Sequence, residues 1–380
     1  MTPEAPPFLA SPQTITGNIL TPTGWVAGTL RFDDHIRAVD GRTIAEPAAG
    51  LPLVLPGFID LHVHGGGGAD IMGGHGAIET AARMHARHGT TSLLATTITA
   101  SRMDLERVFT EAAAAIRGRT SGGARVLGIH LEGPFINPER LGAQPDAVRL
   151  GSLEEIQALH RIAPIRIVTL APEMEGHLEL IRSLKGLGII PQMGHTTASY
   201  EVGLAATEAG ARGYTHLFNA MTPMHHRAPG MVGAAMAHAE FAELIPDLLH
   251  VHPGAIRAAL RAIPKLYCVT DATAGAGMPD GAYSLGTQTV TKCGNGIRLA
   301  DGTLAGSTLT MDDALRNLVA IGVPLAEASR RVSAYAADYL GLKDRGRIEA
   351  EAWADLVVLS PSLQLTDVFV EGERLDLAHV

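Results

Sequence analysis

Residues 55–68, LPGFIDLHVHGGGG, combine a short apolar run with two histidines and four glycines. Side chains alternate between the two faces of a strand, so His62 and His64 lie on one face while Leu61 and Val63 lie on the other. Two imidazoles on one face predict half of a metal site, and the alternative is a pair of histidines on a solvated edge strand. The glycines predict a sharp backbone turn directly after the strand.

Seven further apolar runs of this kind follow along the chain. The eight runs are FIDLHVH, TSLLATT, RVLGIHLEG, IRIVTLAPE, GIIPQMGH, GYTHLFN, DLLHVHP and LYCVTDA. Alanine-rich amphipathic segments such as AIETAARMHARHG and MDLERVFTEAAAAIRG separate several of them. Alternating strands and helices indicate a parallel sheet, and eight units predict an α/β fold with a closed (β/α)8 barrel of the TIM type.

The two ends of the chain have a different character from the middle. Residues 13–54 and 345–380 contain short strand-like runs separated by Gly, Asp and Pro. This pattern predicts a small β-sandwich domain assembled from both ends, with the barrel occupying residues 55–344. Residues 1–12 are Pro-rich and are predicted to be disordered.

Composition narrows the class of protein. The chain has 380 residues, of which 46% are hydrophobic and 18% charged, so it can bury a sizeable core. Its net charge of −9 speaks against a nucleic-acid partner, and its 2 cysteines are too few for a disulfide framework. The N-terminal residues do not resemble a signal peptide, and no long apolar run predicts a membrane partner. We therefore expect a cytoplasmic enzyme.

Polar side chains gather at the ends of the predicted strands, where the active site of such a barrel lies. They are His62, His64, Glu132, His195, His216, His250, His252 and Asp271. Imidazoles and carboxylates bind metals and carry protons, so this set predicts a metal centre. None of the lysines ends a predicted strand, which leaves Glu132 as the candidate bridge between two metals. On its local sequence alone, Asp271 is explained equally well as a helix N-cap and as a catalytic group.

The other histidines are expected to lie outside this centre. Those in predicted helices (His85, His88 and His160) and those in the following loop (His225 and His226) are expected to be exposed rather than ligands. The role of His252 is left open between a pocket residue and a structural one.

Longer motifs extend from about Ile15 to the C-terminus. They are PGFIDLHVHGGGG, HLEGPFINPERLGA, MGHTTASY, THLFNAMTPMHHRAPGMVGAA, LHVHP, VTDATAGAGMPDG and DGTLAGSTLTMDDALRNLV. Together they resemble the N-acetylglucosamine-6-phosphate deacetylases, a metal-dependent branch of the amidohydrolase superfamily. The resemblance implies hydrolysis of N-acetylglucosamine 6-phosphate to glucosamine 6-phosphate and acetate, in amino-sugar catabolism and cell-wall recycling.

The resemblance also implies roles for particular residues. Glu132, His195 and His216 would hold a catalytic divalent metal, zinc or iron, and Asp271 would be the acid/base for a metal-activated water. Relatives that keep both first-strand histidines can hold a second metal, so His62 and His64 imply one or two metals per chain. The implied substrate contacts are Ala143, Gln144, Asn219, Ala220, Arg227, His250, Leu304, Ala305 and Gly306. The resemblance further implies a homodimer, with Arg227 on the phosphate in its own pocket or in the partner's.

Two departures and two competing interpretations remain at this stage. Gln144 stands where many relatives have histidine, and Thr197 stands where relatives usually have an acid. An amidohydrolase acting on another amide and a non-catalytic scaffold are the alternatives, but a scaffold should have lost metal ligands. Without the resemblance, Arg227 would be interpreted as a solvated surface arginine.

Overall fold

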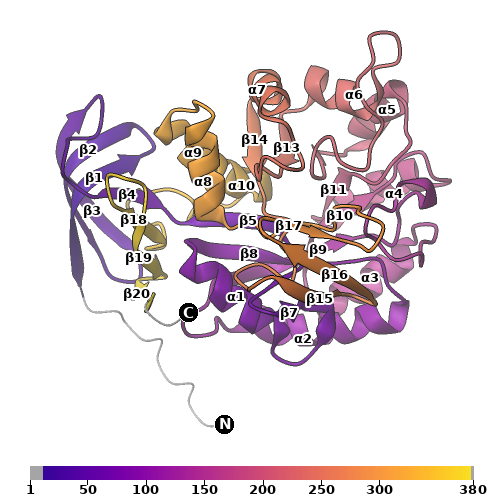
Figure 1. The fold of residues 1–380 in the computed structure, drawn as a ribbon, viewed down its shortest axis with the longest axis horizontal. Helices are drawn as coiled ribbons and strands as arrows, with labels where there is room; N and C mark the ends of the chain where they lie inside the picture. Colours follow the sequence, from indigo (N-terminus) through magenta and orange to yellow (C-terminus); the bar gives the residue numbers. More distant parts are fainter. Residues whose placement is uncertain (1–11, 378–380) are drawn as a thin grey trace.

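The computed structural model describes residues 12–377, and parallel strands form its centre (Figure 1). One parallel sheet has the order β12-β11-β10-β9-β8-β5, and β13 pairs with β14 beside it. The strands are β5 (Phe58–Val63), β8 (Thr90–Thr97), β9 (Arg125–Glu132), β10 (Ile165–Leu170), β11 (Ile190–Met193), β12 (Gly213–Tyr214), β13 (Phe241–Leu244) and β14 (Lys265–Cys268). Residues 1–11, on which most of the predicted disordered segment falls, lie outside the described part.

Backbone hydrogen bonds close these strands into a ring. The amide of Leu217, beyond β12, donates to the carbonyl of Glu243 on β13 at 2.9 Å. The amide of Asp271, beyond β14, donates to the carbonyl of His62 on β5, also at 2.9 Å. The segments that follow β12 and β14 therefore close the ring, and the predicted (β/α)8 barrel is confirmed.

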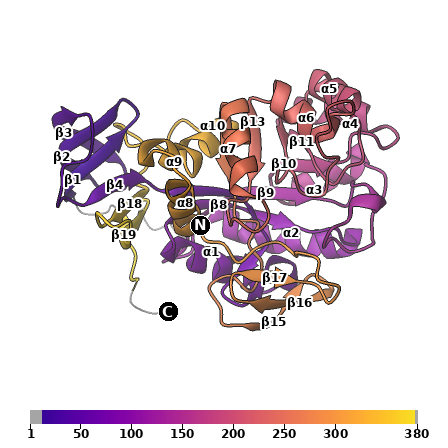
Figure 2. The same cartoon turned by 45° about the horizontal axis from the view of Figure 1, so that its top comes forward.

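A helix follows each barrel strand and packs on the outside of the ring (Figures 1 and 2). The helices are α1 (Ala77–Arg87), α2 (Arg102–Arg117), α3 (Leu153–Ile162), α4 (His177–Gly186), α5 (Tyr200–Ala209), α6 (Gly230–His238), α7 (Pro253–Ala262) and α8 (Met311–Ala320), followed by α9 (Leu325–Arg331) and α10 (Ala334–Leu340). In α2, the Ser101 side chain caps the first turn, and the apolar residues Leu105, Val108, Phe109 and Ala112 are buried. The two alanine-rich segments are therefore the helices that their periodicity predicts.

The prediction that DLLHVHP forms the seventh strand is wrong. The strand at this place is β13, with the sequence FAEL, and residues 247–252 form a turn after it. The Asp247 carboxylate accepts hydrogen bonds from the amides of Leu249 (2.9 Å) and His250 (2.8 Å), while Leu248 has a left-handed φ of 64°. An aspartate bound to the next backbone amides stabilises a turn rather than a strand, which outweighs the apolar pattern here.

Both chain ends contribute to one sheet, as predicted. Its strands are β1 (Gln13–Thr21), β2 (Gly24–Phe32), β3 (Ile36–Ile44), β4 (Leu53–Pro56), β18 (Leu356–Leu359), β19 (Leu365–Val370) and β20 (Glu373–Arg374), in the order β20-β19-β18-β4-β1-β2-β3. Figure 1 shows the indigo N-terminal strands beside the yellow C-terminal ones. A separate apolar core that includes Ile19, Leu30, Val54, Leu356 and Phe369 holds this unit together. The boundaries at residues 54 and 344 stay predictions.

The tetraglycine forms a hairpin at the mouth of the barrel. β6 (Gly65–Gly66) pairs with β7 (Ala69–Asp70), and Gly67 and Gly68 turn the chain with φ of 63° and 83°. The predicted sharp turn is therefore confirmed. A Cβ at Gly65 would lie 2.4 Å from the carbonyl oxygen of Ala69 and 2.9 Å from the backbone nitrogen of Ala274, so the close approach of these backbones also requires glycine. His85 is buried beneath this hairpin, where its ring hydrogen-bonds to the carbonyl of Gly65 at 2.9 Å. The prediction that His85 is exposed is wrong.

A second small sheet, absent from the sequence prediction, follows β14. It consists of β15 (Gly281–Leu285), β16 (Gln288–Cys293) and β17 (Gly296–Arg298), and Figure 2 shows it as a small layer apart from the barrel helices. The Gln288 side chain donates to the carbonyl of Ala143 at 2.6 Å, which ties this sheet to the loop after β9. Short 3-10 turns, η1 (Ile71–Gly73) and η2 (Pro138–Arg140), complete the mouth. Among residues 12–377, none of the helices has both the length and the apolar character needed to cross a membrane.

Candidate active site

The carboxyl ends of the barrel strands carry two groups of metal-binding side chains. Glu132, His195 and His216 form one triad, and His62, His64 and Asp271 form the other. Within each triad the candidate ligand atoms all lie within 4.8 Å of one another, and all six residues are buried. The structure therefore brings together every predicted metal ligand and Asp271.

Glu132 joins the two triads. Its Oε1 lies 3.3 Å from His195 Nε2 and 3.2 Å from His216 Nε2. Its Oε2 lies 3.2 Å from His64 Nε2, and its Oε1 lies 3.5 Å from His62 Nε2. One carboxylate thus faces four imidazoles, which is the arrangement that a bridging ligand requires.

Asp271 occupies the other side of the second triad. Its Oδ1 lies 3.3 Å from His62 Nε2 and 3.1 Å from His64 Nε2. Burial raises the pKa of Asp271, but the two imidazoles outweigh burial and hold that pKa below its usual value. The carboxylate is therefore ionised at neutral pH and available to accept a proton.

The hydrogen bonds behind the rings fix which nitrogen faces the centre. Nδ1 of His62 lies 3.0 Å from a Glu243 carboxylate oxygen, and Nδ1 of His64 lies 3.2 Å from the carbonyl of Thr96. Nδ1 of His195 lies 2.7 Å from the carbonyl of Arg140. These partners are acceptors, so each Nδ1 carries the proton and each Nε2 is left with a lone pair.

These lone pairs point at one another across short distances. The Nε2 atoms of His62 and His64, each left with a lone pair, are 3.1 Å apart. The Nε2 atoms of His195 and His216 are also 3.1 Å apart, and His216 Nδ1 has no partner among the described residues that would fix the position of its proton. Two lone pairs at this separation repel unless a cation or a proton lies between them. The donor set, four imidazoles and two carboxylates, fits a divalent metal.

Protons can substitute for such a cation. Burial lowers the pKa of His64, but Asp271 and Glu132 outweigh burial and raise it to about 9. For the carboxyl group of Glu132 the signs are opposite: burial raises its pKa, but the surrounding histidines outweigh burial and hold that pKa well below its usual value. A metal entering the site would therefore displace protons from the imidazoles.

Strained backbone turns the strand ends toward the centre. His195, His216 and Asp271 have left-handed φ angles of 48°, 29° and 52°. Such conformations cost on the order of 1–3 kcal/mol each in non-glycine residues and persist only where the surroundings impose them. The hydrogen bond from the Asn137 amide to the His195 carbonyl, 2.9 Å, is one such constraint.

A cavity of about 350 Å³ opens above both triads. The predicted substrate contacts that line it are Ala143, Gln144, Asn219, Ala220, His250, Leu304 and Gly306. Ala305 is buried beside it without lining it. Arg227 lies outside this cavity on an exposed loop, where its guanidinium is 2.8 Å from the His226 ring.

Gln144 supports the bridging carboxylate. Its side-chain amide donates to Glu132 Oε2 at 2.6 Å, and its carbonyl accepts from the Thr99 amide at 2.7 Å. Thr197 lies outside the cavity lining, where its amide donates to Glu173 at 2.7 Å. The departure at position 144 therefore places a neutral hydrogen-bond donor on Glu132, a candidate metal ligand, while the departure at position 197 serves loop structure.

Two cationic groups face the cavity. His250 binds Asp247 through Nδ1 at 2.6 Å; burial lowers the pKa of His250, but Asp247 outweighs burial and raises it. Arg140 also lines the cavity, and its Nε is buried without an acceptor among the described residues. An anionic substrate group would satisfy both. His252, by contrast, is structural: its ring accepts the Gly254 amide at 3.0 Å and caps α7.

The sequence prediction missed Arg140, Asp247, His130 and Glu243. His130 precedes Glu132 by two residues, so the same-face rule that paired His62 with His64 would have found it. Glu243 was missed because the seventh strand was placed several residues too late. No local signal distinguishes Arg140 from other loop arginines.

Comparisons with known proteins agree with this geometry. Residues 53–375 match the amidohydrolase family. An N-acetylglucosamine-6-phosphate deacetylase of Bacillus subtilis (strain 168) is 42% identical over 84% of either chain. An N-acetylgalactosamine-6-phosphate deacetylase of Escherichia coli O157:H7 is 38% identical over 93% of this chain and 97% of its own. The structure of a mutant N-acetyl-D-glucosamine-6-phosphate deacetylase from Mycobacterium smegmatis, in complex with N-acetyl-D-glucosamine-6-phosphate, is 36% identical, with a TM-score of 0.89 over 96% of this chain and 99% of that one.

Proposed function

This chain belongs to the amidohydrolase family, and we infer that it hydrolyses N-acetylglucosamine 6-phosphate to glucosamine 6-phosphate and acetate. The observation that carries this inference is the pair of buried triads joined by Glu132 at the base of the cavity. A scaffold without activity would not need this ligand set. An amidohydrolase of another amide would not need the two cationic groups that face the cavity.

Each part of the site has a role in amide hydrolysis. Glu132, His195 and His216 would hold a divalent metal, which would lower the pKa of a water and polarise the acetyl carbonyl. Asp271, ionised beside His64, accepts a proton from the attacking water. The same carboxyl group then donates that proton to the departing amine nitrogen.

The phosphate end of the substrate requires positive charge within a protein of net charge −9. His250, charged through its bond with Asp247, and Arg140 supply such charge inside this chain's own cavity. Asn219 and the backbone around Ala220 line the same region and are proposed to orient the sugar.

The metal is proposed to be zinc or iron, with one or two ions per chain. Imidazole and carboxylate ligands suit both metals. The second triad supports the two-metal form, because in the described part of the chain His62 and His64 have no other evident role.

The galactosamine epimer is a second candidate substrate. The observation that favours it is the N-acetylgalactosamine-6-phosphate deacetylase, which matches a larger share of this chain than the Bacillus subtilis relative does. The two sugars differ only in the orientation of one hydroxyl group, so the metal chemistry would be the same for both.

Acetate release tests the proposed function. The purified protein, loaded with zinc or iron, is expected to release acetate from N-acetylglucosamine 6-phosphate. Its kcat/KM should exceed roughly 10⁴ M⁻¹s⁻¹, the lower end of the range typical of enzymes. N-acetylgalactosamine 6-phosphate and unphosphorylated N-acetylglucosamine are run beside it. A higher kcat/KM for the galactosamine epimer would reassign the substrate, and no acetate from any of the three would overturn the proposal.

We further propose a homodimer in the cytoplasm, where phosphorylated sugars are retained because their charge prevents passage through membranes. Arg227, exposed and outside its own cavity, is proposed to contact the phosphate in the partner's cavity. A guanidinium matches a phosphate geometrically and carries a fixed charge.

Arg227→Ala is expected to lower kcat/KM for the phosphosugar by roughly tenfold to a hundredfold, because a charge-assisted contact contributes ~1.5–3 kcal/mol. Activity on unphosphorylated N-acetylglucosamine should stay the same. The matched control is Arg261→Ala, which removes a different exposed arginine that lies on α7, and it should behave as wild type. Equal losses on both sugars would make Arg227 a structural residue.

A further inference from the structure

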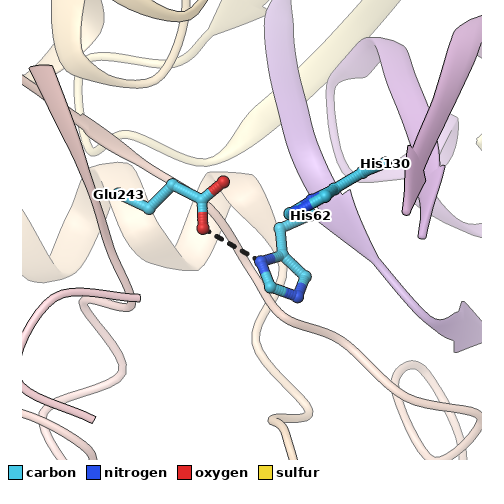
Figure 3. Close-up of side chains that lie close together, drawn as sticks. All are labelled: His62, His130 and Glu243. Atoms are coloured by element: carbon cyan, nitrogen blue, oxygen red, sulfur yellow. Dashed lines mark hydrogen bonds and ion pairs between the residues drawn. The ribbon is translucent and has the colours of Figure 1, made fainter. Parts of the chain in front are cut away.

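A buried carboxylate on β13 lies directly behind the metal centre. Glu243 has no exposed surface, and its Oε2 lies 3.0 Å from His62 Nδ1. Figure 3 shows Glu243 facing the His62 ring, with the interaction drawn as a dashed line. This contact leaves the opposite nitrogen, Nε2, to face Asp271 and Glu132.

The same oxygen also holds the other triad. Glu243 Oε2 accepts the backbone amide of His216 at 3.1 Å. His216 has one of the strained left-handed backbone conformations, with φ of 29°, and an accepted amide hydrogen bond stabilises it. One carboxylate oxygen therefore contacts a ring from the second triad and the backbone of a ligand from the first.

A connected set of hydrogen bonds lies below Glu243 in the barrel. The Tyr267 hydroxyl lies 3.4 Å from Glu243 Oε1 and 3.2 Å from the Gln192 side-chain oxygen. Gln192 in turn donates to Thr215 at 2.9 Å, and Thr215 contacts Thr169 at 2.7 Å.

His130 ends this set of hydrogen bonds on the far side of His62. Its Nε2 lies 2.8 Å from the Thr169 hydroxyl oxygen, and its Nδ1 lies 3.1 Å from the Leu61 carbonyl oxygen. Its ring packs edge-on against the His62 ring, with 4.6 Å between the two ring centroids. A ring already engaged at both nitrogens cannot replace Glu243 as the acceptor for His62.

We propose that Glu243 is the positioning residue of the metal centre: it fixes His62 as an Nε2 ligand and holds the His216 backbone, so that both triads keep the geometry for metal binding. A buried carboxylate in contact with the proton of a ligating imidazole orients the ring and increases its basicity. The proposal rests on the proposed function only through the metal centre, and it needs no substrate.

The test is metal affinity, measured by competition between the protein and a chelator for zinc. Glu243→Leu removes the acceptor and is expected to weaken zinc binding about tenfold to a hundredfold, with the ion bound at His62 lost first. Glu243→Gln keeps an acceptor oxygen without the charge and should lose less. Tyr267→Phe, the matched control, removes the 3.4 Å contact with Glu243 Oε1 and the 3.2 Å contact with Gln192 but leaves the contacts of Glu243 Oε2 with His62 and His216, and it should bind zinc as wild type does.

A second measurement separates positioning from folding. In the zinc-loaded protein with ¹⁵N-labelled histidine, NMR should show His62 with its proton on Nδ1 and its metal on Nε2, and Glu243→Gln or Glu243→Leu should weaken that signature while thermal unfolding remains cooperative. Wild-type zinc affinity and an unchanged His62 spectrum in the variants would overturn the proposal. Failure of acetate release in the wild-type enzyme would instead overturn the proposed function.

Discussion

Asp271→Asn is expected to bind metal and substrate but to lose at least ~10²-fold in kcat. The amide keeps the size of the carboxylate and an oxygen near His62 and His64, so the cavity should keep its shape. It cannot accept a proton from water at neutral pH, nor return one to the amine nitrogen. Steady-state acetate release and metal analysis of the same preparation measure both parts of this expectation.

The pH dependence provides a second readout. In the wild-type enzyme Asp271 must be ionised, and its pKa lies below the usual value for an aspartate. Activity should therefore persist from neutral pH into the acid range and fall as this carboxylate and the imidazoles that bind the metal become protonated. Asp313→Asn, on the exposed side of α8, is the matched control and should leave kcat unchanged. Near-wild-type kcat in Asp271→Asn would remove this residue from the proton transfer.

Glu132→Gln is expected to empty the metal centre. This carboxylate is the group that faces both triads, and the amide has neither the charge nor the second anionic oxygen needed to bridge them. A catalytic metal contributes several kcal/mol to the transition state, so kcat/KM should fall by about 10³-fold or more. Elemental analysis should find little bound metal in this variant.

His62→Asn/His64→Asn is the matched comparison for that variant. It removes ligands from the second triad and leaves Glu132, His195 and His216 in place. Bound metal should fall from two ions per chain to about one, in contrast to the nearly complete loss in Glu132→Gln. Equal metal content in the double variant and wild type would return the histidine pair to a substrate-facing or structural role, and full metal retention in Glu132→Gln would contradict the bridging role.

Much of the fold and of the ligand set could be predicted from the sequence because both depend on short-range patterns. Alternation along β5 places His62 and His64 on one face, and the apolar periodicity of α1 and α2 defines those helices. The carboxyl ends of parallel strands meet at one face of a barrel, so residues at those ends could be assigned to one site before any coordinates. The longer motifs then indicated the substrate class.

Other features depend on contacts that no local pattern encodes. Whether FAEL or DLLHVHP forms the seventh strand was decided by the turn at Asp247, and this in turn located Glu243. The position of Arg227 outside its own cavity follows from the path of a long loop, which sequence periodicity does not describe. Such loops are set by their packing and hydrogen bonds with distant segments.

By itself, the sequence determined the strand faces of β5, most of the helices and the set of candidate metal ligands. Only the tertiary structure decided that Glu132 contacts both triads, that Gln144 supports it, and that Glu243 lies behind His62 across a separation of 181 residues. The physical reason is the closure of the barrel: the hydrogen bond from the amide of Asp271, after β14, to His62 of β5 brings the first and last strand ends to within a few ångströms of one another. The sequence pattern specifies each strand's faces, but the relative positions of distant strands arise from packing of the whole chain.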